Sequence, residues 1–213
     1  MQEGEPRYAS NKWLEELSAV ASSSSMTLAA HLCGERVNEV LNGDDSFIST
    51  LHSMGFRRVQ INATAVNGVD TSYLAESVQN VLSIIDRHVN LEFIIQKNDE
   101  TKPLWEGIVR LNGNVTMLVD ESKGAGLLPN SWPTPPKEYK IGYAGGIGPD
   151  NITTVLNEVM IAGSGSEIWI DMESSLRTLD NNGNDIFDLN KCMRCIDAVC
   201  ESGIYEHPSY LSR

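Results

Sequence analysis

The sequence contains no apolar run that approaches the roughly 20 residues needed to cross a bilayer, and it is poor in basic residues. Its 213 residues include 16 Lys and Arg but 29 Asp and Glu, so the formal net charge is −13. Nucleic acids and anionic membranes repel such a protein, and we expect it to bind neither, although a local basic pocket for a small phosphate is not excluded. The first ten residues are polar and acidic, so we expect no signal peptide and a cytoplasmic protein.

Cysteines are also few, and three of the four crowd into one C-terminal segment: Cys33, Cys192, Cys195 and Cys200. Without a secretory signal, reduced thiols are expected. Cys192 and Cys195 form a C-x-x-C pair, but the pattern places this pair in the middle of a helix and not at a strand-to-helix turn. We therefore interpret both as small residues on a packed helix face, and we predict neither a metal site nor a cofactor.

The composition, with 41% hydrophobic and 21% charged residues, is typical of a globular protein and fits one α/β domain over residues 1–213. Short apolar runs rich in β-branched residues predict strands at 26–32, 56–62, 91–96, 115–119, 140–144 and 168–171. Amphipathic stretches predict helices at 11–21, 35–41, 46–54, 73–88, 103–111, 150–162 and 188–201. We expect a flexible connector at 22–25 and a loop with little helix at 124–136.

These elements make about six β–α units in series, which predicts a parallel sheet covered by helices. An open doubly wound sheet and a closed (β/α)8 barrel are the competing architectures. Polar residues or glycines follow four of the predicted strands: Gln60 and Asn62, then Asp120, then Gly145 and Gly146, and finally residues 171–175. Because the carboxyl ends of parallel strands meet at one edge, we predict an active site there.

The stretch GGIGPDN at 145–151 is the most informative of these. Glycines let the backbone approach an anion closely, and Pro149 suits the first turn of a helix that begins near Asp150. Exposed N–H groups at that helix start favour a phosphate. The stretch is neither a P-loop nor G-x-G-x-x-G, so a nucleotide is not implied. The alternative is a tight turn capped by Asp150.

Asp120 follows the apolar run 115–119, where a carboxyl at a shielded mouth is suited to general acid catalysis. The alternative is a solvated turn aspartate. Lys123 and the glycine-rich loop that follows it, with Gly124 and Gly126, are interpreted as a mobile lid.

Taken together, these segments resemble phosphoribosylanthranilate isomerase, a barrel enzyme of tryptophan biosynthesis. YAGGIGPDNI at 143–152 is similar to the family's AGGL-x-P-x-NV phosphate turn after strand seven, and DMESSLR at 171–177 to its D-v-s-S-G-v-E stretch after strand eight. Val119-Asp120 with GAG at 124–126 resembles LD…GGTG of strand six, VQIN at 59–62 resembles VQLHG of strand four, and PRY at 6–8 resembles the S-P-R loop after strand two. The order and spacing fit from Arg7 to the C-terminus.

The resemblance implies a TIM-type (β/α)8 barrel that is incomplete at the N-terminus, with strands three to eight present and strands one and two absent. We therefore expect a chain that is truncated, borrows strands from a partner or closes in an unusual way. Exposed sheet edges also favour a homo-oligomer.

The family isomerises an N-linked ribose phosphate from aldose to ketose and needs no cofactor. By this resemblance Asp120 is the general acid and Arg7 holds the anthranilate carboxylate. Four residues match the phosphate cradle: Gly145, Gly146, Ser174 and Ser175. We expect the remaining substrate contacts from Gln60, Asn62, Gly124, Gly126, Asp171 and Glu173.

The departures from the family leave the reaction open. The family's base is a strand-one cysteine, and Cys33 or His31 is the candidate substitute. Asn62 stands where the family has histidine, and Ser175 where it has a glycine that admits the phosphate. The alternatives are a barrel that binds a small anion or a partner without catalysis, and a different sugar-phosphate enzyme with His31, Glu173 or Asp171 as its base.

Overall fold

Six strands form one parallel sheet in the computed structural model, which describes residues 8–24, 26–109 and 113–203. Each strand pairs with the next along the chain, in the order β1 to β6. The strands are β1 (Leu28–Leu32), β2 (Phe56–Ile61), β3 (Glu92–Lys97), β4 (Val115–Val119), β5 (Lys140–Tyr143) and β6 (Ile168–Ile170). A doubly wound sheet reverses its strand order at a switch point. This sheet does not, so the doubly wound alternative is excluded.

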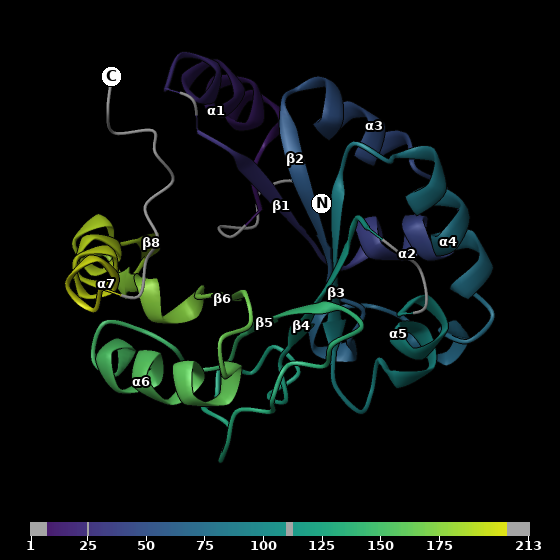
Figure 1. The fold of residues 1–213 in the computed structure, drawn as a ribbon. Helices are drawn as coiled ribbons and strands as arrows, with labels where there is room; N and C mark the ends of the chain where they lie inside the picture. The colour runs from purple at the N-terminus through teal and green to yellow at the C-terminus, as the bar shows by residue number, and fades with distance from the viewer. Residues whose placement is uncertain (1–7, 25, 110–112, 204–213) are drawn as a thin grey trace.

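The sheet is curled into a half-barrel with helices on its outer face (Figure 1). Seven α-helices lie within the described residues: α1 (Asn11–Ser24), α2 (Glu35–Leu41), α3 (Ser46–Ser53), α4 (Val78–Arg87), α5 (Lys102–Ile108), α6 (Ile152–Gly163) and α7 (Leu189–Glu201). No helix of the described chain is long and apolar enough to cross a membrane.

Alternation along the strands divides the buried residues between the two faces of the sheet. Phe93, Ile95 and Met117 belong to the large core that the helices cover. Their neighbours Ile94 and Leu118 belong to a separate small cluster on the concave face, with Ala144 and Trp169. Strands β3 and β4 are therefore buried on both faces, which explains their nearly continuous apolar sequences.

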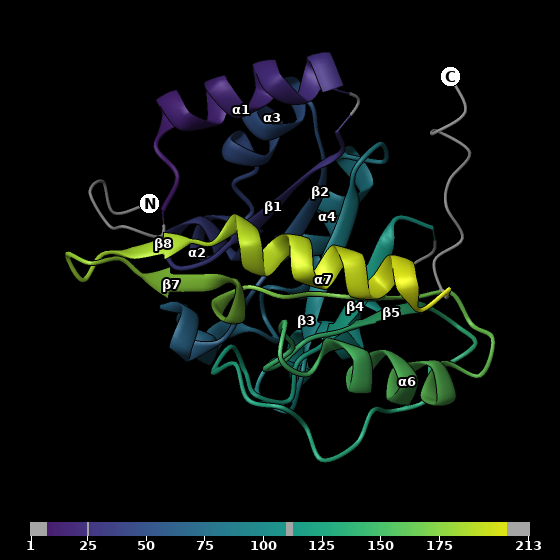
Figure 2. The ribbon, with the colours of Figure 1, turned by 90° about the vertical axis from the view of Figure 1, so that its left-hand side faces the viewer.

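The half-barrel is open between β1 and β6, because no strand in the described ranges pairs with the outer edge of either. Figure 2 views this side, with α1 above, α6 below, and α7 and a β-hairpin between them. The hairpin consists of β7 (Arg177–Leu179) and β8 (Asp185–Phe187), which pair in antiparallel fashion. A closed barrel is thus not formed by the described residues.

Two local predictions were wrong, and one element was missed. The serines expected to form a connector at 22–25 instead extend α1 to Ser24, where the Ser22 and Ser24 hydroxyls donate to carbonyl oxygens four residues earlier at 2.9 and 2.8 Å. The helix predicted at 73–88 begins only at Val78, because Asp70 caps a separate 3₁₀ turn, Thr71–Tyr73. The β7–β8 hairpin was not predicted.

Candidate functional site

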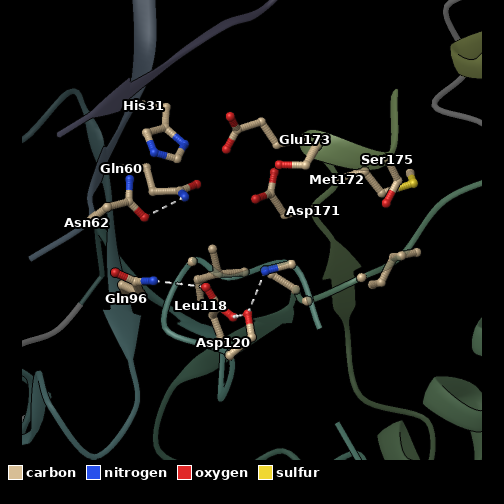
Figure 3. A pocket seen from close by; sticks show the side chains of 18 of the residues that line it. His31, Gln60, Asn62, Gln96, Leu118, Asp120, Asp171, Met172, Glu173 and Ser175 are labelled. Atoms are coloured by element: carbon tan, nitrogen blue, oxygen red, sulfur yellow. Dashed lines mark hydrogen bonds between the residues drawn. The ribbon is translucent and has the colours of Figure 1, made fainter. Parts of the chain in front are cut away.

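One cavity lies at the carboxyl ends of the parallel strands and is lined by residues that belong to or directly follow each of the six (Figure 3). About 60 Å³ of it is open to the centres of water-sized molecules, and its empty space is about 520 Å³ when the open solvent at its mouth is counted. Its polar lining consists of His31, Gln60, Asn62, Asn67, Gln96, Asp120, Ser122, Asp171, Glu173, Ser174 and Ser175, and its glycines are Gly124, Gly126, Gly145 and Gly146. The strand-end residues from which the sequence analysis predicted a site line this cavity.

Strand register explains why these side chains meet. His31 of β1 pairs with Gln60 of β2, and Gln96 of β3 pairs with Leu118 of β4. Paired residues of parallel strands point to the same face. Asp120 lies two residues beyond Leu118 and so returns to the concave face at the mouth.

Asp120, only 6% exposed, is fixed by two donors. The Gln96 amide Nε2 donates to Oδ2 at 2.9 Å, and the Ser122 hydroxyl donates to Oδ1 at 2.6 Å. The Ser122 oxygen in turn accepts from the backbone N–H of Gly126 at 3.1 Å. The loop that follows β4 is thereby tied to the carboxylate, and Asp120 is not the solvated turn residue of the alternative interpretation.

Gln60 and Asn62 form a second polar pair on β2. The Gln60 amide donates to Asn62 Oδ1 at 2.9 Å, and the Asn62 amide donates to the Leu32 carbonyl at 3.1 Å. Asn62 therefore ties the ends of β1 and β2 together, and its position fixes the direction of the Gln60 side chain.

Asp171 lies across the cavity from the Gln60–Asn62 pair. Burial raises the pKa of the Asp171 carboxyl, and the nearby carboxylates of Glu173 and Asp120 raise it further. His31 and a hydrogen bond from Gln60 oppose this change in pKa. Figure 3 shows His31 from β1 and Glu173 from the loop after β6 at the same end of the cavity as Asp171.

The glycine turn after β5 is packed against the loop after β4. Gly145 has φ +108° and Gly146 has φ +62°, and a Cβ on either would lie 2.7 Å from the backbone of Leu127 or Leu128. Asn151 fixes the turn by donating to the Gly146 carbonyl at 2.8 Å and accepting from the Gly148 N–H at 2.9 Å. Glycine is required here for close approach of a second loop as well as for the turn itself.

Free backbone donors remain at this turn. Within the described part of the chain, the N–H groups of Gly145 and Gly146 have no hydrogen-bond acceptor, and the same holds for Ser174 and Ser175 in the neighbouring turn. The two turns touch, because Ser175 packs its Cβ directly over Gly148. The residues predicted to cradle a phosphate are thus brought together, with unused donors.

The side chains around the cavity are acidic. Asp120, Asp171 and Glu173 are accompanied by His31, and no lysine or arginine from the described ranges is part of the lining. Arg177, which follows the predicted cradle, is bound to Asp185 of the hairpin at 2.9 Å. The neutralising charge for an anionic ligand therefore does not come from the side chains that line the cavity in the described structure.

Two predicted site residues are not placed in the cavity. Cys33 follows β1, is half-buried, and does not line the cavity. Arg7 lies outside the described residues.

Three polar lining residues were not among the predicted site residues: Asn67, Gln96 and Ser122. Gln96 lies near the end of an apolar strand, as Gln60 does, and Ser122 lies two residues after Asp120. The position of Gln96 near the end of a strand, which it shares with Gln60, was the signal that could have identified it.

The C-x-x-C pair lies on α7, as predicted. Burial raises the pKa of the Cys192 and Cys195 thiols, which favours their unreactive protonated form. No group of three or more His, Cys, Asp or Glu side chains in the described chain is arranged to hold a metal ion.

Comparison of the chain with protein-family models, with curated proteins and with solved structures finds no match.

Proposed function

We propose that this chain is a phosphoribosylanthranilate isomerase-like enzyme, built on an incomplete TIM-type barrel, that converts a phosphorylated ribose conjugate from aldose to ketose. The observation that carries the proposal is the cavity itself. It gathers Asp120, the glycine turn after β5 and the serine turn after β6 at one end of a parallel half-barrel. Sequence segments up to 55 residues apart thus converge where barrel enzymes hold their substrates, in the arrangement that the family resemblance requires.

Each of these parts has a role in the reaction. Asp120 protonates the ring oxygen so that the furanose opens, and Gln96 and Ser122 hold its carboxyl group in place. The unused N–H groups of the two turns receive the phosphate, because backbone donors can bind an anion without a charged side chain. Gln60 lies where it can hold a sugar hydroxyl. No cofactor takes part in this chemistry.

The acidic lining favours a second candidate, an enzyme or binding protein for an uncharged sugar. Three carboxylates without a lysine or arginine among the described lining residues repel a phosphate dianion. In this candidate the glycines serve only the packing of the loop that carries Leu127.

A turnover assay separates the two. The full chain is incubated with N-(5′-phosphoribosyl)anthranilate, and substrate and ketose product are separated by chromatography. We expect product with the wild-type chain and none with Asp120→Asn. If the wild-type chain forms no product but its melting temperature rises with ribose, the second candidate is correct.

A further inference from the structure

The proposed isomerisation needs a base as well as an acid. After the ring opens, a proton must leave C2′, and the family's base lies on a strand that this chain does not match. Cys33, the candidate thiol, is not part of the cavity lining. The base must therefore be sought among the titratable groups that do line it: His31, Asp120, Asp171 and Glu173.

Asp120 is already engaged by two donors. Its Oδ2 accepts from Gln96 and its Oδ1 from Ser122, both within 2.9 Å. It is fixed on the wall formed by β3 and β4, beside the glycine turn. A second proton-transfer group has to approach the substrate from elsewhere around the cavity.

The other three groups lie together on the opposite wall. His31 and Glu173 are exposed at the mouth, whereas Asp171 lies deeper and is half-buried. In Figure 3 the Asp171 carboxyl lies between the Glu173 side chain and the Asp120 side of the cavity. A sugar bound between the two walls has Asp120 on one side and Asp171 on the other.

We propose, on the basis of the proposed function, that the Asp171 carboxylate is the base that removes the C2′ proton, with Asp120 as the acid on the opposite wall. Asp120 gives its proton to the ring oxygen, the C1′–O bond breaks, and the nitrogen lone pair forms C1′=N. Asp171 takes the C2′ proton, the released electron pair forms C1′=C2′, and the C=N pair returns to nitrogen. Asp171 then protonates C1′ while the C2′ hydroxyl proton returns to Asp120, which leaves a ketone. Both carboxyl groups end as they began.

The surroundings of Asp171 suit this role. Burial makes its carboxylate a stronger base than a solvated one, because it raises the pKa of the carboxyl. Glu173 on the same loop acts in the same direction, and His31 on β1 and Gln60 on β2 oppose it. His31, in its protonated form, is then a positioning residue that favours the ionised form of Asp171.

Kinetics of variants with N-(5′-phosphoribosyl)anthranilate, protonated or deuterated at C2′, test the assignment. We expect Asp171→Asn to lower kcat about a hundredfold or more with a small change in KM, and Asp171→Glu to restore part of it. Asp86→Asn, the same chemical change at an exposed position on α4, serves as the matched control and should retain full activity. Deuterium at C2′ should slow the wild-type reaction.

A pH profile adds a readout that a purely structural role of Asp171 does not give. Loss of the opposing His31 should move the acidic limb of kcat to higher pH in His31→Gln, because the pKa of Asp171 rises further. Full kcat in Asp171→Asn, or an unmoved acidic limb in His31→Gln, overturns the assignment and leaves the proposed isomerase in place. Loss of activity in Cys33→Ser, with Asp171→Asn active, assigns the base to the thiol. Absence of wild-type turnover overturns the proposed function and this assignment together.

Discussion

Replacing Gly148 with alanine is expected to destabilise the protein where two turns of the cavity meet. An added Cβ would lie 2.4 Å from the Cβ of Ser175 and 3.1 Å from its hydroxyl oxygen. Real side chains do not approach so closely, so one of the turns must move. Gly148 does not have a positive φ, and the predicted effect is therefore one of packing and not of backbone strain.

The structure also gives the compensating change. Without the Ser175 side chain, the nearest atom of that residue to the new Cβ is its Cα at 3.7 Å, an ordinary contact. Overpacking of this kind costs about 2 kcal/mol, so Gly148→Ala should lower stability by that amount. Ser175→Gly alone should cost about 0.5–1 kcal/mol through backbone entropy. The double variant should be less stable than wild type by only about 1 kcal/mol, because the clash is gone.

Urea unfolding followed by circular dichroism measures all four proteins. With a typical slope for a small protein, 2 kcal/mol lowers the midpoint by about 1 M. If the loss of stability in the double variant equals the sum of the losses in the two single variants, the two turns do not touch. The reasoning about this end of the cavity would then be wrong.

Three further outcomes are expected. Asp120→Asn should reduce isomerase turnover at least about a hundredfold in a steady-state assay; a variant with normal turnover would remove Asp120 from the reaction. Burial alone would raise the pKa of Asp45, but hydrogen bonds from Arg87 and His88 outweigh it and lower that pKa; Asp45→Asn should therefore lose stability at pH 7 by about 1 kcal/mol, and the difference should vanish as pH falls below the ordinary value of 3.8. Equal loss at pH 7 and at pH 2.5 would contradict this ion pair. In Gly145→Ala the new Cβ sits at a φ of +108° and lies 2.7 Å from a backbone oxygen, whereas in Gly113→Ala only the φ is strained. Gly145→Ala should therefore lower the melting temperature more than Gly113→Ala. Equal melting temperatures for the two variants would contradict the packing of the two loops.

Apolar periodicity was sufficient to predict the sheet. The strand at 115–119 agrees with β4 at both ends, and the helix at 35–41 with α2. The strand is clear because it is a continuous apolar run that is buried on both faces, and the helix because Val37, Val40 and Leu41 recur at helical spacing. The parallel direction of the strands followed from the serial β–α pattern, whereas their order did not, because the pattern also fitted a doubly wound sheet. The α/β class and the six units were therefore within reach of the sequence.

The β7–β8 hairpin could not be predicted from the sequence, because each of its strands has only three residues. Arg177, Asp185 and the capping residue Asp188 give it a polar sequence, and its stability depends on contacts such as the Arg177–Asp185 pair. Such contacts between side chains are invisible before the chain is folded. The Asn182-Gly183 dipeptide was the one local indication of a turn.

The candidate site was predictable as a set of strand ends but not as a network. Asp120, Gln60 and Asp171 could be named because each follows or ends an apolar run. The role of Gln96 depends on a distance of 2.9 Å to a residue on the neighbouring strand. The deeper position of Asp171 depends on the loop after β6. Neither the Gln96–Asp120 hydrogen bond nor the burial of Asp171 can be predicted from the spacing of residues in the sequence.

The most direct test of the central claim, that this cavity holds a phosphorylated sugar, is a titration with ribose 5-phosphate followed by backbone amide NMR. We predict saturable shifts of the N–H signals of Gly145, Gly146, Ser174 and Ser175, because these donors have no acceptor among the described residues. Signals on α3 and α4 should stay unchanged. Absence of shifts at the two turns, or shifts confined to other surfaces, would contradict the account.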